Sequence, residues 1–230
     1  MLTYLLTNIF TILVPFSYSF ERKIAYYRSW KYLFPAIFIT GTFFIIWDII
    51  FTDIGIWSFN PSYLTGIYLF NLPIEEWLFF LTVPYSCVFI YEAMNYYIKK
   101  DYLQPYAQHI TYILAFLLLI LAVLNHDKLY TFINFTFSAL FLLAHIFIFK
   151  TKHLGRFYLA YLVHLIPFFL VNGLLTSLPV VLYNPTENLG VRIGSIPVED
   201  SIYSMLLLLM NISIYEYLKT RKTKTMRDNK

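Results

Sequence analysis

The sequence predicts an all-α integral membrane protein with seven transmembrane helices, arranged as two parallel three-helix repeats joined by a connector helix. Three observations lead to this class. The 230-residue chain is 59% hydrophobic and only 13% charged, whereas a soluble domain carries roughly 25% charged residues. Seven apolar runs have lengths near the roughly 20 residues that a spanning helix needs. One group of motifs occurs twice at a constant spacing.

The seven apolar runs comprise residues 2–19, 32–51, 74–98, 110–124, 129–149, 157–182 and 198–218. The first lacks the basic stretch and the small-residue cleavage site of a secretory leader, so we expect it to remain as a span. The fourth is the shortest, and the polar turn Asn125-His126-Asp127-Lys128 separates it from the fifth, which predicts a helical hairpin. The basic segment after Leu218 is expected to be a frayed, solvated tail.

The lysine and arginine residues predict the orientation of the spans, because cytoplasmic flanks hold the excess of these residues. Of the 17 basic residues, 15 follow the first, third, fifth or seventh span, and only Lys128 and Arg192 fall on the other side. Removing the fourth span would reverse every later loop and destroy this bias. We therefore predict seven spans in the cytoplasmic membrane, with the N-terminus outside and the C-terminus in the cytoplasm.

The repeated motifs are displaced by 124 residues. The first copy contains Asn60-Pro61, Gly66, Pro73, Glu75-Glu76 and Tyr91-Glu92, and the second contains Asn184-Pro185, Gly190, Pro197, Glu199-Asp200 and Tyr215-Glu216. A constant offset indicates an internal duplication. The predicted division is a first repeat over 1–98, a connector with the fourth span over 99–128, a second repeat over 129–218 and a basic cytoplasmic tail over 219–230. The copies lie four spans apart, so they run in the same direction, and a site is expected at their interface.

Two acidic pairs open matching spans and supply four candidate catalytic groups: Glu75, Glu76, Glu199 and Asp200. Acidic residues near a helix N-terminus also complement the helix dipole by roughly 0.3–1 kcal/mol without any further role. Residues of N-cap type, Asn71 and Ser195, stand just before each pair. A carboxylate inside a membrane is costly, however, and two copies of such a pair favour a functional role.

Asp48, near the outer end of the second span, is a fifth candidate catalytic residue, and Asn172 is its counterpart in the second copy. Both are expected to face the same cavity as the acidic pairs. The alternative is that each forms a hydrogen bond within its own helix bundle. Glu92 lies about 25 Å along the helix from Glu75, so we expect it to anchor the membrane interface near Lys99 instead.

Aromatic residues crowd the Asn-Pro loops: Trp47, Phe51, Trp57, Phe59, Tyr63, Trp77, Phe79 and Phe80. An interfacial belt accounts for most of them, although some ring faces could stabilise a developing positive charge. Cys87 stands in an apolar run and is interpreted as a core side chain. His145 and His164 lack a second ligand at helical spacing, and no glycine-rich phosphate loop is present. We therefore expect neither a metal nor a nucleotide site.

The stretch from Phe59 to Gly66, the run Leu72-Pro73-Ile74-Glu75-Glu76 and the pair Tyr91-Glu92 resemble the small membrane lycopene cyclases. This family occurs as two separate subunits or as one fused chain, and the resemblance covers nearly the whole sequence, which implies the fused two-copy form. The second copy departs from the pattern, because Asp200 replaces the second Glu and Asn172 stands where Asp48 does.

The resemblance implies a non-redox isomerisation in carotenoid biosynthesis, in which the linear ends of lycopene are closed to β-rings by way of γ-carotene to β-carotene. One of Glu75 and Glu76 would be the acid, and a carboxylate of the same cluster would be the base. No cofactor is expected. The expected partners are the carotenoid within the bilayer, membrane lipids and other carotenoid enzymes, with no nucleic acid. The candidate substrate-binding residues are Asn60, Pro61, Asn184, Pro185, Asn172 and Trp77.

Three alternatives remain open at this point. The chain could be another carotenoid end-group enzyme, such as a hydratase or a C50 carotenoid cyclase. It could be a small carboxylate-lined transporter, because paired repeats with intramembrane carboxylates also occur there, although the acidic residues cluster at the starts of spans. It could also be a partner subunit without activity of its own.

Overall fold

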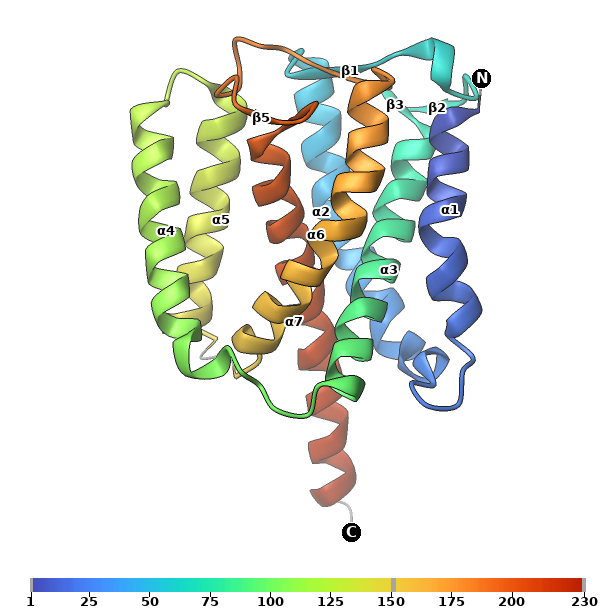
Figure 1. Cartoon of the computed structure of the whole chain (residues 1–230), viewed down its shortest axis with the longest axis vertical. Coiled ribbons are helices and arrows are strands. Elements are labelled where there is room, and N and C mark those ends of the chain that lie inside the picture. The colour runs from blue at the N-terminus through green and yellow to red at the C-terminus, as the bar shows by residue number, and fades with distance from the viewer. Residues whose placement is uncertain (1, 150–151, 229–230) are drawn as a thin grey trace.

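The computed structural model describes residues 2–149 and 152–228, with side chains described up to residue 221. Its described part is a bundle of seven α-helices, capped at one end by short strands (Figure 1). The helices are α1 (Thr3–Tyr18), α2 (Trp30–Asp53), α3 (Ile74–Tyr97), α4 (Ala107–Leu124), α5 (Leu129–Phe147), α6 (Leu154–Ser177) and α7 (Val198–Asp228). The all-α class is therefore confirmed.

Six of these helices, α2 to α7, are long and apolar enough to cross a membrane. The exception is α1, an apolar helix of 16 residues, which is about 24 Å long at 1.5 Å per residue. Large apolar side chains such as Phe38, Phe116 and Leu170 are exposed on the outside of the bundle. An outer surface of this kind fits a lipid environment, because large apolar patches are uncommon on soluble monomers.

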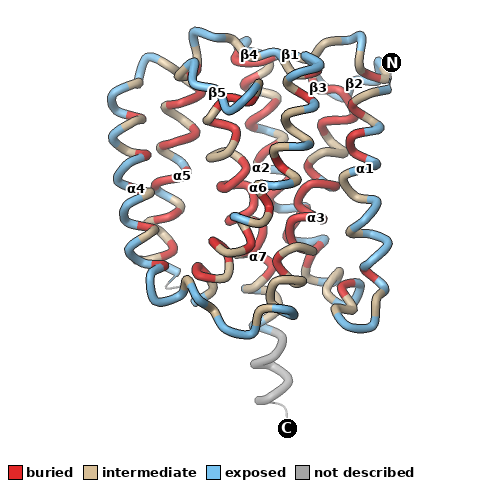
Figure 2. The backbone as a smooth tube through the Cα atoms, in the orientation of Figure 1, coloured by how far each residue is buried: buried red, intermediate tan, exposed pale blue. Residues whose placement is uncertain are grey.

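The core lies along α3 and α7, which run through the middle of the bundle (Figure 2). The helix α1 packs on α3, and α5 packs on α7. The helix α6 also contacts α3, while α2 contacts α7. The helix α4 packs mainly on α5, at one edge of the bundle. The contacts of α3 with α1 and α6 thus have counterparts in the contacts of α7 with α5 and α2.

Three antiparallel strand pairs form the cap: β1 (Trp57–Phe59) with β4 (Val181–Tyr183), β2 (Tyr68–Leu69) with β3 (Leu72–Pro73), and β5 (Arg192–Ile193) with β6 (Ile196–Pro197). The β1–β4 pair joins the two halves. Trp57 faces Tyr183, and Phe59 faces Val181. Residues 57 and 181 are themselves 124 apart, as are 59 and 183, so the register has the pattern of a twofold rotation.

Short 3-10 turns complete the connections: Tyr26–Ser29, Pro61–Tyr63 and Gln104–Tyr106. Glycine occurs at the same position in both copies because of the backbone conformation there. Gly66 has φ +83° and Gly190 has φ +73°, a left-handed conformation that glycine adopts without the steric cost of a Cβ atom. Both glycines lie in the loops that lead to the acidic pairs, so the motif preserves the same chain reversal in each half.

Two local expectations are wrong. Asn71 and Ser195 do not cap helices, because Pro73 is the N-cap residue of α3, and Asn71 Nδ2 instead donates to the carbonyl of Ile49 at 2.8 Å. Ser195 Oγ contacts Thr176 Oγ1 at 2.6 Å. These side chains therefore tie the hairpins to the ends of α2 and α6.

The basic tail expected after Leu218 is helical up to Asp228, so the prediction of a frayed segment is wrong for the described backbone. Lys150 and Lys230, which contribute to the charge bias, lie outside the described residues. Glu92 also differs from expectation, because its partner is not Lys99. Glu92 Oε1 accepts from Lys219 Nζ at 2.7 Å and from the Tyr215 hydroxyl at 2.9 Å, so it joins α3 to α7.

Candidate active site

Glu75 and Glu199 hold the hairpin loops in place. Glu75 Oε1 accepts from the backbone N–H of Thr65 at 2.6 Å. Glu199 Oε1 accepts from the backbone N–H of Leu189 at 2.7 Å, and residues 65 and 189 are again 124 apart. Both glutamates are fully buried. Their side chains point toward the loops, and neither is among the residues that line the cavity described below.

We expect the Glu75→Ala variant to be less stable than the Glu75→Gln variant. A glutamine still offers an oxygen to the Thr65 N–H, whereas alanine leaves that group without its acceptor. A buried donor left without a partner costs roughly 1–3 kcal/mol. The melting temperature in detergent measures the difference. Equal melting temperatures for the two variants would contradict the loop-holding role.

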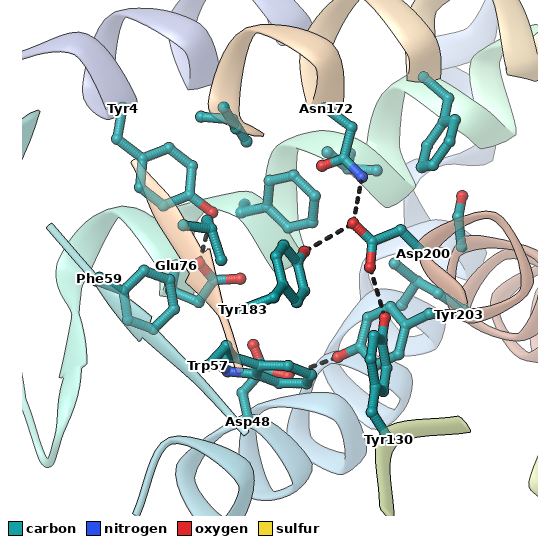
Figure 3. Close-up of a pocket in the computed structure, with 17 residues that line it drawn as sticks. Tyr4, Asp48, Trp57, Phe59, Glu76, Tyr130, Asn172, Tyr183, Asp200 and Tyr203 are labelled. Atoms are coloured by element: carbon teal, nitrogen blue, oxygen red, sulfur yellow. Dashed lines mark hydrogen bonds between the residues drawn. The ribbon is translucent and has the colours of Figure 1, made fainter. Parts of the chain in front are cut away.

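The second residue of each acidic pair, Glu76 and Asp200, lines one shared cavity (Figure 3). Asp48 from α2 and Asn172 from α6 line it as well. The cavity measures about 70 Å³ and lies beneath the β1–β4 pair, because Trp57, Phe59, Val181 and Tyr183 line it. All three carboxyl groups are buried. The cavity therefore collects carboxyl groups from both halves of the chain, in apolar surroundings.

Glu76 and Asp48 form a carboxyl pair. Both line the cavity, and each lies close enough to act on the other electrostatically. Two carboxyl groups that share a buried site do not both ionise readily, so the pair favours a state in which one of them holds a proton. The Tyr4 hydroxyl donates to Glu76 Oε2 at 2.5 Å. The Tyr203 hydroxyl donates to Asp48 Oδ1 at 2.6 Å. The pair can thus hold one proton in a buried position, and a tyrosine hydroxyl donates a hydrogen bond to each member.

Asp200 is held differently, because three donors converge on it (Figure 3). The Tyr130 hydroxyl donates to Oδ1 at 2.7 Å. The Tyr183 hydroxyl donates to Oδ2 at 2.7 Å, and Asn172 Nδ2 donates to the same oxygen at 3.0 Å. Burial and the neighbouring Asp200 carboxyl raise the pKa of Tyr183 well above its usual value, so its hydroxyl stays protonated as a donor. Three donors suit a carboxylate that bears the negative charge.

The tyrosines of the cavity are functional candidates that the sequence analysis missed. Tyr4 bonds to Glu76 as Tyr130 bonds to Asp200, and Asn8 and Asn134 donate to the backbone carbonyls of Glu75 and Glu199 at 2.9 and 2.8 Å. A Tyr-x-x-x-Asn pattern therefore recurs in α1 and α5. Its spacing is 126 residues rather than 124, so a search at one fixed offset does not find it.

Aromatic rings form much of the cavity wall. Of the eight aromatic residues that crowd the loops, Trp57, Phe59 and Phe79 line the cavity. Phe168 adds a further ring from α6. The Trp57 ring packs edge-on against Tyr130 with centroids 5.2 Å apart. Ring faces attract cations, so the wall can stabilise a positive charge formed inside.

Four of the other five candidate substrate-binding residues lie in the loops, and Trp77 lies in the first turn of α3. Asn60 Oδ1 accepts from the Ser62 N–H, and Asn184 Oδ1 accepts from the Thr186 N–H, each at 3.1 Å. Pro61 and Pro185 follow these asparagines within the same turns. Trp77 stacks on Phe70 with centroids 6.2 Å apart. Among the six candidates, only Asn172 lines the cavity.

A larger apolar groove of about 570 Å³ runs between α1, α3 and α6. It shares Phe79, Val83, Phe168 and Asn172 with the acidic cavity, so these residues form the wall between the two. Its rim includes Phe10 and Leu170, whose side chains are 69% and 72% exposed. The groove therefore opens sideways, toward the surface that lipid would cover.

Cys87 and His164 line the groove at a buried polar contact. His164 Nδ1 lies 3.1 Å from Cys87 Sγ, and His164 Nε2 lies 3.0 Å from Ser204 Oγ. Ser204 lines the acidic cavity on the other side. The histidine is thus a buried side chain with a polar partner for each ring nitrogen.

Comparison with models of protein families gives a match over both halves of the chain. A family model described as lycopene cyclase matches residues 1–94 and 127–218, which together make up most of the chain. The unmatched stretch between the two segments contains α4. No match was found among curated proteins or among solved structures.

Proposed function

The chain belongs to the lycopene cyclase family, and from this premise we propose that it is a fused two-copy lycopene β-cyclase acting on both ends of lycopene. One observation carries the proposal. Glu76, Asp48 and Asp200 meet in a buried aromatic cavity beside a groove that opens to the lipid-facing surface. The cavity thus supplies an acid, a base and apolar surroundings, and the end of a polyene has none of these without the enzyme.

The proposed reaction begins with the Glu76–Asp48 pair, which gives its proton to C2 of the end group. The resulting cation at C1 is attacked by the C5=C6 double bond, so that C1–C6 forms and the positive charge moves to C5. A carboxylate of the cluster then removes the proton from C6, which creates the new C5=C6 bond. The proton balance is zero and no electrons are exchanged, so the chain's own carboxyl groups complete the cycle.

Asp200 would face the cation as a carboxylate oriented by Tyr130, Tyr183 and Asn172. Preorganised charge aimed at a developing opposite charge is the strongest form of stabilisation in a site closed to water. The aromatic walls add cation–π attraction. Exclusion of water protects the cation from capture, which would otherwise give a hydroxylated product.

The groove between α1, α3 and α6 would hold the polyene chain while its tip enters the cavity. The four shared wall residues include Phe79 and Phe168, whose rings would have to turn aside or frame the passage. The substrate would arrive from the bilayer, and we propose the cytoplasmic membrane as the location. The hairpin end would be outside, because the described basic residues gather mainly at the opposite end.

We also propose that residues 1–98 and 129–218 are repeats of one unit, connected by the segment that contains α4. The β1–β4 register supports this, and so do the paired contacts of Glu76 with Tyr4 and Asp200 with Tyr130. The halves are not equivalent in chemistry. Asp48 pairs with Glu76, whereas Asn172 donates to Asp200, so the proposed proton-donating pair lies entirely in the first half.

Expression of the chain alone in a lycopene-accumulating host tests the proposal. We expect γ-carotene and β-carotene, identified by their retention, spectra and mass. Hydroxylated end groups would indicate a hydratase, and a product only from a prenylated precursor would indicate a C50 cyclase. Unchanged lycopene with normal protein levels would contradict independent cyclase activity and favour a partner subunit or a transporter.

Glu92→Gln is expected to retain the rate of ring formation. Glu92 lies 16 positions beyond Glu76 on α3, which is about 24 Å along the helix. Its contact with Lys219 is partly exposed, so its loss costs roughly 1 kcal/mol or less. Initial rates and melting temperatures of the purified variant measure the two effects. A large loss of rate at unchanged stability would instead give Glu92 a role in the reaction.

A further inference from the structure

The bundle has two lateral faces that occupy equivalent positions in the two halves. One lies between α1 and α6, and the other lies between α5 and α2. The first contains the groove of about 570 Å³. The second is filled by aromatic rings, because the Phe137 centroid lies 6.2 Å from that of Phe43 and 5.4 Å from that of Trp47.

The residues that fill the second face correspond to smaller residues in the first. Phe43 and Trp47 are 124 positions before Pro167 and Val171. Phe137 is 126 positions after Thr11, the same spacing that relates Tyr4 to Tyr130 on these helices. The corresponding groove residues are Pro167, Val171 and Thr11, and all three line the open groove. At three matched positions, an aromatic ring of the filled face thus stands where the open groove has a smaller side chain.

We propose that the carotenoid reaches the acidic cavity only through the groove between α1 and α6, so that the two ends of one molecule are closed in separate binding events. This inference rests on the proposed cyclase function. The proposed acid is the Glu76–Asp48 pair, which lines a single cavity, and this cavity of about 70 Å³ holds little more than the tip of a chain. The far end of a rigid polyene therefore stays in the groove or in lipid while the first ring closes.

Release of a monocyclic intermediate follows from this geometry. The first ring must leave by the way it came, because the opposite face is sealed by Trp47 and Phe137. The molecule must then reverse end for end before its second tip can enter. Because each departure exposes the intermediate to competition from fresh substrate, the enzyme is distributive rather than processive.

The first test fills the groove with the residues of the sealed face. The double variant Thr11→Phe/Val171→Trp should form rings at a rate roughly tenfold or more below wild type, because the larger rings occupy the volume that the polyene needs. Matched controls are Leu13→Phe on α1 and Ile166→Trp on α6, which are exposed positions outside the groove. These should retain the wild-type rate. A double variant that folds and cyclises at the wild-type rate would overturn the single entrance.

The second test needs no variant. Wild-type protein in liposomes is loaded with isotopically labelled lycopene and then chased with excess unlabelled lycopene. The expected result is labelled γ-carotene that persists, with the chase suppressing labelled β-carotene. Labelled β-carotene formed at the same yield with and without the chase would overturn the inference. If the wild type forms no ring at all, the proposed function itself fails, which is a separate outcome.

Discussion

Glu76→Gln is expected to reduce ring formation by about a thousandfold, because a positioned acid or base contributes roughly 10²–10⁴ to a rate. Glutamine preserves the size of the side chain and can still accept from the Tyr4 hydroxyl, but it cannot release a proton to a carbon atom. It also leaves Asp48 without a second carboxyl group with which to share a proton. The measurement is the initial rate of cyclisation by purified protein in liposomes containing lycopene.

The matched control is Glu75→Gln, one residue earlier on the same helix. Glu75 faces the Thr65 loop and does not line the cavity, so this variant should keep most of its rate. Both variants should have melting temperatures close to that of the wild type. The assignment of Glu76 would be contradicted if the Glu76 variant stayed active while the Glu75 variant lost its activity.

Asp200→Asn is expected to have the second-largest effect, a rate loss of roughly 10²–10³, which is the scale for removing one preorganised electrostatic group. An amide carries no net charge to oppose the cation. Its NH₂ group would also meet the hydroxyl of Tyr130 or Tyr183, which now donates to Asp200. Product analysis should show a higher share of misdirected products, such as hydroxylated end groups, because a cation without its counter-charge is captured more readily by water.

Tyr183→Phe perturbs the same carboxylate less than Asp200→Asn does. It removes one of the three donors to Asp200 and leaves the carboxylate in place, so its rate should fall between those of the wild type and Asp200→Asn. The order of the three rates is the result to observe. A wild-type rate for Asp200→Asn would exclude this carboxylate from the reaction.

The helices and the acidic motifs could be predicted from sequence, because hydrophobic length and repeated spacing are local properties. The sequence could not show which member of each acidic pair lines the cavity and which holds the loop. Neighbouring residues on a helix point about 100° apart, so only one member of Glu75-Glu76 or Glu199-Asp200 can face the cavity. Which one does so depends on the rotation of α3 and α7 in the bundle. That rotation is fixed by packing against α1, α2, α5 and α6.

The tyrosine partners of the carboxyl groups could not be predicted from the sequence, for a different reason. Tyr203 on α7 donates to Asp48 on α2, across 155 positions of sequence, and no spacing rule connects them. The pairing of Glu92 with Lys219 is of the same kind, since Lys99 is nearer in sequence but Lys219 is nearer in space. Asn71 and Ser195 resemble N-caps by type and position, yet the hairpins turn these side chains toward the helix ends before them.

The arrangement of the site depends on the end group reaching the carboxyl groups of both halves at once. A structure of the Glu76→Gln variant with lycopene bound in a membrane mimetic tests this directly. One tip of the polyene should lie between residue 76, Asp48 and Asp200, with the chain following the groove along α1 and α6. Density for the carotenoid along another face of the bundle, with the acidic cavity empty, would contradict it.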